Sequence, residues 1–252
     1  MYKIPVGTLF LGKNLLILPE CPSTNTLAAE LAQKGQAPEG TTVITHHQTS
    51  GRGQRGNTWE SGKGLNLTFS VVLNPVFLAA GQQFLLNKTI ALAIHDVVRN
   101  YTTDSVGVKW PNDIMIGDKK VCGTLIENQL TGEKLSRSII GIGLNVNQAD
   151  FPTPLGSSLS LHSPQPMDLA KLFDELLQSI EWRYLELKRG EIEKVDSDYL
   201  RSLYRVGEEH KFTVNDEEVD GIIRNVEVNG RLIVEIDRMN RSFDLKEIKF
   251  VF

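Results

Sequence analysis

The stretch Gly51–Leu73 reads GRGQRGNTWESGKGLNLTFSVVL and joins a glycine-rich loop to a strand. Glycine lets a backbone turn sharply and approach a ligand closely, and arginine supplies a positive charge that persists at neutral pH. The loop therefore favours an anion as its ligand, although an ordinary surface loop with solvated charges has a similar composition. From Leu65 to Leu73 every second residue is apolar and the residues between are mostly polar, which predicts a half-buried strand.

The segments around this stretch alternate between helical and strand patterns. Residues 23–35 begin with helix-capping side chains and end at a glycine, which predicts a short helix. The alternation, without repeats, predicts a mixed α/β fold. The other predicted elements are strands over 41–47, 106–116, 120–130 and 136–147, the last three as antiparallel neighbours, and helices over 82–99, 168–189 with Asp168 as N-cap, and 192–204.

The sequence changes in character near Val206. From there to the last residue it contains only short strand patterns, and Asn229-Gly230 predicts a hairpin turn between two of them. We therefore predict two domains, a large one over residues 1–205 and a small all-β domain over residues 206–252.

Composition excludes several classes of protein. The 252 residues carry a net charge of −4, which argues against a general nucleic-acid binder because such proteins need a basic surface. The two cysteines form neither a disulfide framework nor a zinc-binding spacing. No apolar run approaches the roughly 20 residues of a membrane span, and the first residues lack a secretory signal, so we expect a cytoplasmic protein that does not enter a membrane.

Four polar or glycine-rich segments lie between the predicted elements: STN (23–25), QTSGRGQRGNTWES (48–61), KWPNDI with KKVCG (109–123) and GIGLNVN (141–147). Each has an ordinary structural explanation when taken alone. The first can be a helix N-cap, and the glycines of the last can mark a strand against which a neighbour packs closely. His46 and His47 are adjacent on a predicted strand, so they point to opposite faces and cannot share a metal.

Taken together and in this order, the four segments resemble the biotin protein ligase family, and the resemblance extends from residue 20 to the C-terminus. It implies a large α/β (α+β) domain with the mixed β-sheet of class II aminoacyl-tRNA synthetases and lipoate ligases, followed by a small SH3-like β-barrel. It also implies that ATP, with Mg²⁺, activates biotin as biotinyl-5′-AMP, and that biotin then passes to one lysine of a biotin carboxyl carrier domain in a carboxylase such as acetyl-CoA carboxylase.

The resemblance assigns roles to individual residues. Strand alternation puts Lys119 and Lys120 on opposite faces, and the family pattern selects Lys120 as the catalytic cation, together with Arg52 and Arg55. No dedicated metal-binding set is assigned. The implied biotin-binding residues are Ser23, Thr24, Asn25, Gln48, Gly51, Arg52, Gly53, Gln54, Lys120 and Gly123, and those implied to contact the nucleotide or its magnesium are Arg52, Arg55, Trp59, Asn112, Asp113 and Asn145.

Two departures from the family pattern bear on function. Gln54 and Asn57 stand where relatives can carry basic residues, which weakens the charge that retains the adenylate. Only about twenty residues precede STN, too few for a helix-turn-helix domain, so we expect a short form without operator binding and a monomer or weak homodimer.

Two other functions compete with biotin ligation. Lipoate ligation uses the same adenylation chemistry, but a long apolar slot would suit lipoate better than the polar set of STN and Gln48. A non-catalytic ligand- or RNA-binding relative of class II synthetases is opposed by the acidic net charge and by the cations Arg52, Arg55 and Lys120.

Overall fold

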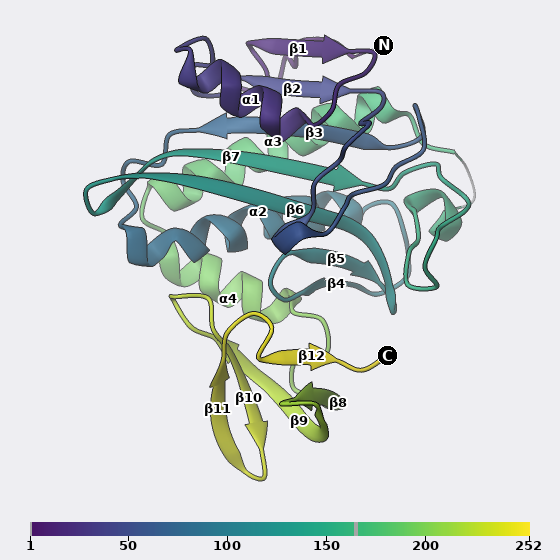
Figure 1. The fold of residues 1–252 in the computed structure, drawn as a ribbon, viewed down its shortest axis with the longest axis vertical. Coiled ribbons are helices and arrows are strands. Elements are labelled where there is room, and N and C mark those ends of the chain that lie inside the picture. The colour runs from purple at the N-terminus through teal and green to yellow at the C-terminus, as the bar shows by residue number, and fades with distance from the viewer. Residues whose placement is uncertain (1, 164–165) are drawn as a thin grey trace.

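The computed structural model describes residues 2–163 and 166–252, without the side chain of Arg55. Its centre is a seven-stranded mixed sheet in the order β1-β2-β3-β7-β6-β5-β4, in which only β1 and β2 pair in parallel (Figure 1). The predicted mixed α/β fold is confirmed. The strands are β1 Leu15–Leu18, β2 Thr42–Thr45, β3 Leu67–Leu73, β4 Val106–Lys109, β5 Asp113–Ile116, β6 Lys119–Thr131 and β7 Lys134–Leu144.

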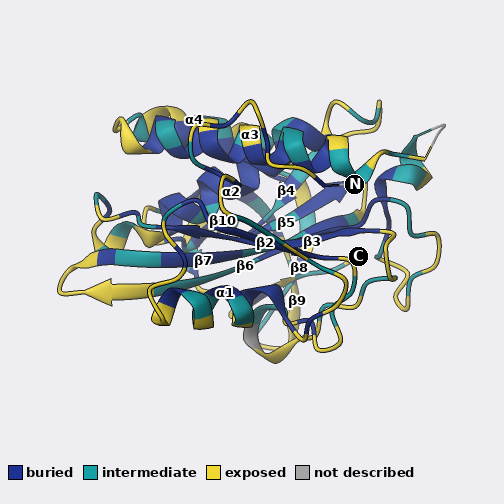
Figure 2. Cartoon of the chain, turned by 90° about the horizontal axis from the view of Figure 1, so that it is seen from above, coloured by how far each residue is buried: buried dark blue, intermediate teal, exposed yellow. Residues whose placement is uncertain are grey.

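Helices cover both faces of this sheet. Figure 2 shows α2, α3 and α4 on one face and α1 on the other. The predicted caps are present, since Ser23 Oγ accepts from the Thr26 amide at 3.5 Å and an Asp168 carboxylate oxygen accepts from the Ala170 amide at 2.8 Å. The helices are α1 Thr24–Gln33, α2 Gln83–Val98, α3 Leu169–Lys188 and α4 Ile192–Ser202, and short 3₁₀ turns lie at η1 Gln54–Gly56, η2 Ala80–Gln82 and η3 Leu159–His162.

Strand β3 is buried on both faces, so the prediction of a half-buried strand is wrong. Its apolar face packs into the core beneath α2 and α3. On the opposite face, Val72 joins a second cluster with Ala28 and Ala32 of α1. The alternation in the sequence arose because this second face carries Ser70, which donates to Asn25 Oδ1 of α1, and Thr68, whose hydroxyl lies 3.5 Å from Ser61 Oγ.

The stretch 106–116 contains two strands and not one. β4 ends at Lys109 and β5 begins at Asp113, and the residues between them form a hairpin turn. The turn carries Trp110, whose indole Nε1 donates to the Gly230 carbonyl at 2.9 Å. The KWPND motif therefore forms the corner between the large sheet and the C-terminal part of the chain.

The C-terminal strands form a separate antiparallel sheet in the order β11-β10-β9-β8-β12, which confirms the predicted small β unit. It lies against the large unit (Figure 1). At this junction Lys88 Nζ of α2 donates to the Val226 carbonyl at 3.1 Å. The division at residue 206 into independent domains stays a prediction. The strands are β8 Glu209–Val214, β9 Glu217–Val226, β10 Leu232–Ile236, β11 Met239–Phe243 and β12 Ile248–Phe250. No helix in the described ranges is long and apolar enough to cross a membrane.

Candidate active site

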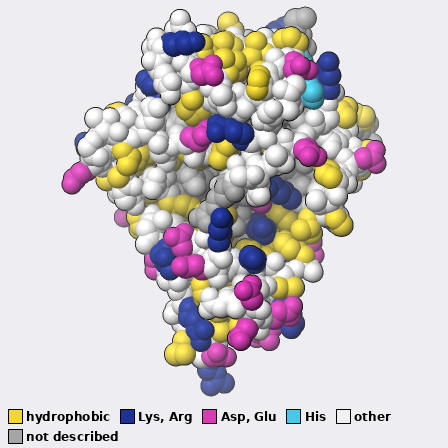
Figure 3. Space-filling model, viewed as in Figure 1, with side chains coloured by type: hydrophobic (Ala, Val, Ile, Leu, Met, Phe, Trp, Pro, Cys, Tyr) yellow, Lys and Arg dark blue, Asp and Glu magenta, His cyan; other side chains and the backbone are white. Residues whose placement is uncertain are grey.

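A pocket of about 200 Å³ lies between the start of α1, the glycine loop, the β4–β5 turn, the first half of β6 and the end of β7. Basic side chains gather around the hollowed centre of the face shown in Figure 3. The pocket thus collects residues from all four sequence segments. Its lining comprises Ser23, Thr24, Asn25, Gln48, Arg52, Gly53, Gln54, Asn57, Thr58, Trp59, Thr68, Lys109, Trp110, Pro111, Asn112, Asp113, Lys120, Gly123, Thr124, Leu125, Gly141, Ile142 and Gly143.

One end of the pocket, here called the amide end, consists of Ser23, Thr24, Asn25 and Gln48. These side chains are fixed by hydrogen bonds within the protein. Gln48 Oε1 accepts from the Thr24 amide at 2.8 Å, and Asn25 Oδ1 accepts from Ser70 Oγ at 2.6 Å. The first turn of α1 therefore sets the direction of a compact polar group before any ligand enters.

The floor of the pocket is made of strand glycines that support other side chains. A Cβ atom on Gly143 would lie 2.3 Å from the indole of Trp59, and one on Gly141 would lie 2.4 Å from Asn25 Oδ1. Only glycine allows such close approach. The indole Nε1 of Trp59 is buried without a hydrogen-bond partner within the described residues, so no hydrogen bond of the indole fixes the ring.

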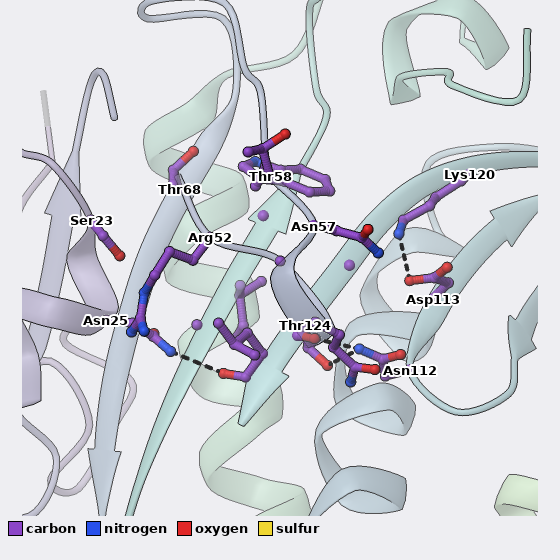
Figure 4. A pocket seen from close by; sticks show the side chains of 18 of the residues that line it. Ser23, Asn25, Arg52, Asn57, Thr58, Thr68, Asn112, Asp113, Lys120 and Thr124 are labelled. Atoms are coloured by element: carbon purple, nitrogen blue, oxygen red, sulfur yellow. Dashed lines mark hydrogen bonds and ion pairs between the residues drawn. The ribbon is translucent and has the colours of Figure 1, made fainter. Parts of the chain in front are cut away.

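Arg52 lies at the amide end and has a carboxylate partner. Its Nη2 atom is 2.7 Å from Glu127 Oε2, and the same oxygen accepts from Asn25 Nδ2 at 2.9 Å. Figure 4 shows Arg52 beside Asn25, away from Lys120. An incoming anion would have to compete with Glu127 for the guanidinium.

The opposite end, here called the lysine end, consists of Lys109, Asp113 and Lys120. Lys120 Nζ lies 2.7 Å from Asp113 Oδ1 across the β5–β6 pair, and 5.8 Å from the centroid of the Trp59 ring (Figure 4). Burial lowers the pKa of the Lys109 ammonium below its usual range, and the neighbouring Lys120 charge acts in the same direction, whereas Asp113 opposes it. Two cations and one carboxylate give this end a net positive charge suited to phosphate.

Comparison with known proteins identifies the family in which this pocket occurs. The model of the Biotin/lipoate A/B protein ligase family matches residues 18–145, just over half of the chain. The chain belongs to this family.

Individual relatives cover more of the chain. A bifunctional ligase/repressor BirA of Bacillus spizizenii is 37% identical over 188 residues, which are 72% of this chain and 57% of the relative. A biotin--[acetyl-CoA-carboxylase] ligase of Mycobacterium tuberculosis is 26% identical over 89% of this chain and 84% of the relative. A biotin protein ligase from Aquifex aeolicus, solved in complex with biotin and ATP, superimposes with a TM-score of 0.77 and 25% identity over 95% of this chain and all of that one. The chain spans little more than half the length of the Bacillus relative.

Most residues selected from the ligase pattern line the pocket, whereas Gly51 and Asn145 lie outside its lining. Gly51 closes the base of the glycine loop, where its carbonyl accepts from the Trp59 amide at 3.0 Å. Asn145 is buried outside the lining, and its Nδ2 donates to the Ser157 carbonyl at 3.0 Å. The side chain of Arg55 lies outside the described residues. The nucleotide contacts of Asn145 and Arg55 stay predictions.

The two adjacent lysines of β6 separate as alternation predicts. Lys120 faces the pocket, whereas the exposed Lys119 donates to the Pro154 carbonyl at 2.5 Å. The same loop meets Lys120 through its backbone, since the Lys120 amide donates to the Leu155 carbonyl at 2.7 Å. The loop after β7 therefore packs beside the lysine end, which the sequence pattern did not reveal.

Sequence reasoning missed other residues of this ligase-family site, among them Thr68, Thr124 and Lys109 of the pocket lining and Glu127, which lies outside the lining and pairs with Arg52. Thr68 is a polar side chain on a strand that is buried along its whole length, a signal that could have pointed to it, whereas Thr124 lies on β6, where buried and partly exposed residues are mixed. Lys109 belongs to the KWPND motif, but only its asparagine and aspartate were selected. Glu127 gave no signal, because it lies 75 positions from Arg52 along the chain.

Proposed function

We propose that this chain activates biotin with ATP as biotinyl-5′-AMP and transfers biotin to a lysine of a biotin carboxyl carrier domain, with biotin at the amide end and MgATP at the lysine end. The observation that carries the proposal is the junction of these two ends in one pocket. The ureido ring of biotin has N–H donors and a carbonyl acceptor, which need convergent polar partners when buried. Ser23, Thr24, Asn25 and Gln48 offer such partners.

The first step joins two anions, so it needs fixed positive charge. A carboxylate oxygen of biotin attacks the α-phosphorus of ATP, the bond to the bridging oxygen breaks, and pyrophosphate leaves with its electrons. Lys120 lies between the two ends and is suited to hold the biotin carboxylate and the α-phosphate together. Asp113, which pairs with Lys120, supplies the carboxylate that suits the Mg²⁺ carried by ATP.

The second step transfers the acyl group. The amine of the acceptor lysine attacks the biotinyl carbonyl carbon, the bond to the phosphate oxygen breaks, and AMP leaves. Lys120 can still neutralise the phosphate of the departing AMP, because this phosphate is the former α-phosphate of ATP that Lys120 contacts in the first step. The carrier domain is therefore expected to approach at the open face of the pocket, above the lysine end.

The names of the relatives support this assignment over its alternatives. The Mycobacterium relative is a biotin--[acetyl-CoA-carboxylase] ligase, and the Aquifex structure holds biotin and ATP. Lipoate ligation is less well supported, since the amide end offers amide and hydroxyl groups where a long alkyl chain needs an apolar slot. We further propose a monomer or weak homodimer that binds no DNA operator; the acidic net charge of −4 argues against operator binding. A cytoplasmic location fits the use of ATP and the two buried free thiols, Cys21 and Cys122.

Transfer to a carrier domain tests the complete reaction. The protein, ATP, Mg²⁺ and biotin are incubated with a purified carrier domain, and intact mass reports modification. We expect one biotin on the wild-type carrier and none on a carrier whose acceptor lysine is replaced by arginine. A parallel reaction contains lipoate in place of biotin, and lipoylation there without biotinylation in the first reaction would contradict the proposal.

A further inference from the structure

Lys109 differs from the other described cations of the pocket in what surrounds its charge. Arg52 and Lys120 each contact a carboxylate at 2.7 Å. The ammonium of Lys109 has no ion-pair or hydrogen-bond partner among the described side chains. Its Nζ atom lies instead 5.0 Å from the centroid of the Phe250 ring and 5.5 Å from that of Phe252.

These two rings belong to the C-terminal unit, and neighbouring residues fix them. Phe250 of β12 packs on Phe212 with centroids 5.3 Å apart. Phe252 stacks on Tyr204 at 6.4 Å and an interplanar angle of 19°, and the Arg205 guanidinium lies 5.6 Å from its centroid. The last residues of the described chain are therefore held against the end of β4, where Lys109 lies.

An aromatic face acts on a cation differently from a carboxylate. It attracts the ammonium through the negative face of the ring and restricts its position, but it leaves the positive charge uncompensated. Because the rings also displace water, the ammonium interacts more strongly with a phosphate that enters. Burial at this position already lowers the pKa of Lys109, which agrees with such displacement of water.

We propose that the C-terminal unit sets the affinity of the pocket for the polyphosphate of ATP by holding the Lys109 ammonium against Phe250 and Phe252. Lys109 contacts the polyphosphate, and the two phenylalanines are positioning residues that act through it. This inference rests on the proposed function for the identity of the nucleotide. It goes beyond that function because it gives the β unit a defined part in nucleotide binding.

The test compares Phe252→Leu, which keeps an apolar cover, with Phe252→Trp, which keeps an aromatic face. Phe252 is 51% exposed, so neither change removes a core side chain. Met239→Leu, at a residue of the same unit that is 58% exposed, is the matched control. Dissociation constants for MgATP and for biotin are measured separately by calorimetric titration of the full chain, which does not depend on turnover.

We expect Phe252→Leu to weaken ATP binding about two- to fivefold, as loss of an exposed cation–π contact would, and to leave biotin binding unchanged. Phe252→Trp, which keeps an aromatic face, should bind ATP as tightly as wild type, and so should Met239→Leu. In a Lys109→Gln background, Phe252→Leu should have no further effect, because the ring acts only through the ammonium.

Unchanged ATP binding in Phe252→Leu, or an equal loss of biotin binding, would overturn the inference. So would ATP binding in Phe252→Trp as weak as in Phe252→Leu, or a further loss of ATP binding when Phe252→Leu is added to Lys109→Gln. A wild-type protein that binds no ATP would overturn this inference and the proposed function together. A wild-type protein that binds ATP but forms no biotinyl-adenylate would contradict the proposed function alone.

Discussion

At the amide end of the pocket, polar side chains are fixed by hydrogen bonds to one another, whereas at the lysine end a cation is held by a carboxylate and another by aromatic rings. Gln48 and Asn25 already have partners before ligand binds. Lys120 must exchange Asp113 for a substrate anion, at least in part. The difference indicates that ligand binding at the amide end depends on the shape of a prearranged polar group, whereas ligand binding at the lysine end depends on positive charge.

The largest effect is expected from removing the central cation of the lysine end. Lys120→Ala should reduce biotin-dependent exchange of pyrophosphate into ATP by about 10²- to 10³-fold, because it removes a group aimed at the developing charge. The fold should survive, since the side chain is 37% exposed. Lys119→Ala is the matched control and should retain wild-type exchange. Equal loss in both variants would mean that the two lysines are not divided between the pocket and the surface.

Adding a charge to the glycine loop should make the loop side of the pocket more like the lysine end. Gln54 lines the pocket, so Gln54→Arg can add a charge-assisted hydrogen bond to the adenylate phosphate, worth about 1.5–3 kcal/mol. Release of biotinyl-adenylate should slow roughly ten- to a hundredfold. The neutral variant Gln54→Met should not slow release. Unchanged release from Gln54→Arg would show that residue 54 does not face the phosphate.

A change of shape in the floor should affect biotin and spare ATP. Gly141→Ala places a methyl group against Asn25 Oδ1 of the amide end, and overpacking of this kind costs about 1–3 kcal/mol. Biotin binding, measured by calorimetry, should weaken about five- to a hundredfold. Gly81→Ala is the control because a Cβ there meets no atom within 4 Å. An equal loss of ATP binding would contradict the separation of the two ends.

The smallest effect is expected from removing the ion pair between Arg52 and Glu127 at the amide end. Glu127→Gln keeps an acceptor for Asn25 but frees Arg52 from an ion pair in which both side chains are more than a third exposed. Such pairs contribute about 0–1 kcal/mol, so the thermal unfolding midpoint should move little. The affinity for ATP should rise by about twofold or less, because less competition remains for Arg52. Glu133→Gln, at the β6–β7 turn, is the control, and a large loss of stability would show that Glu127 is a structural anchor.

Local signals in the sequence predicted the elements that build the amide end. Ser23 caps α1, as expected from its sequence. The glycines of GIGLNVN have a closely packed neighbour, which agrees with the structural explanation offered for them. The features that the sequence did not predict depend on contacts between residues that are distant in the chain. The burial of β3 on both faces follows from where α1 packs. The setting of Lys109 depends on Phe250 and Phe252, more than a hundred residues away, which no local pattern indicates.

The central claim is that the two ends meet to activate biotin, and exchange of labelled pyrophosphate into ATP by the wild-type protein tests it most directly. Three parallel reactions contain biotin, lipoate or neither acid. We predict exchange with biotin and only background exchange in the other two reactions. Exchange that requires lipoate, or that proceeds equally without any acid, would contradict the account.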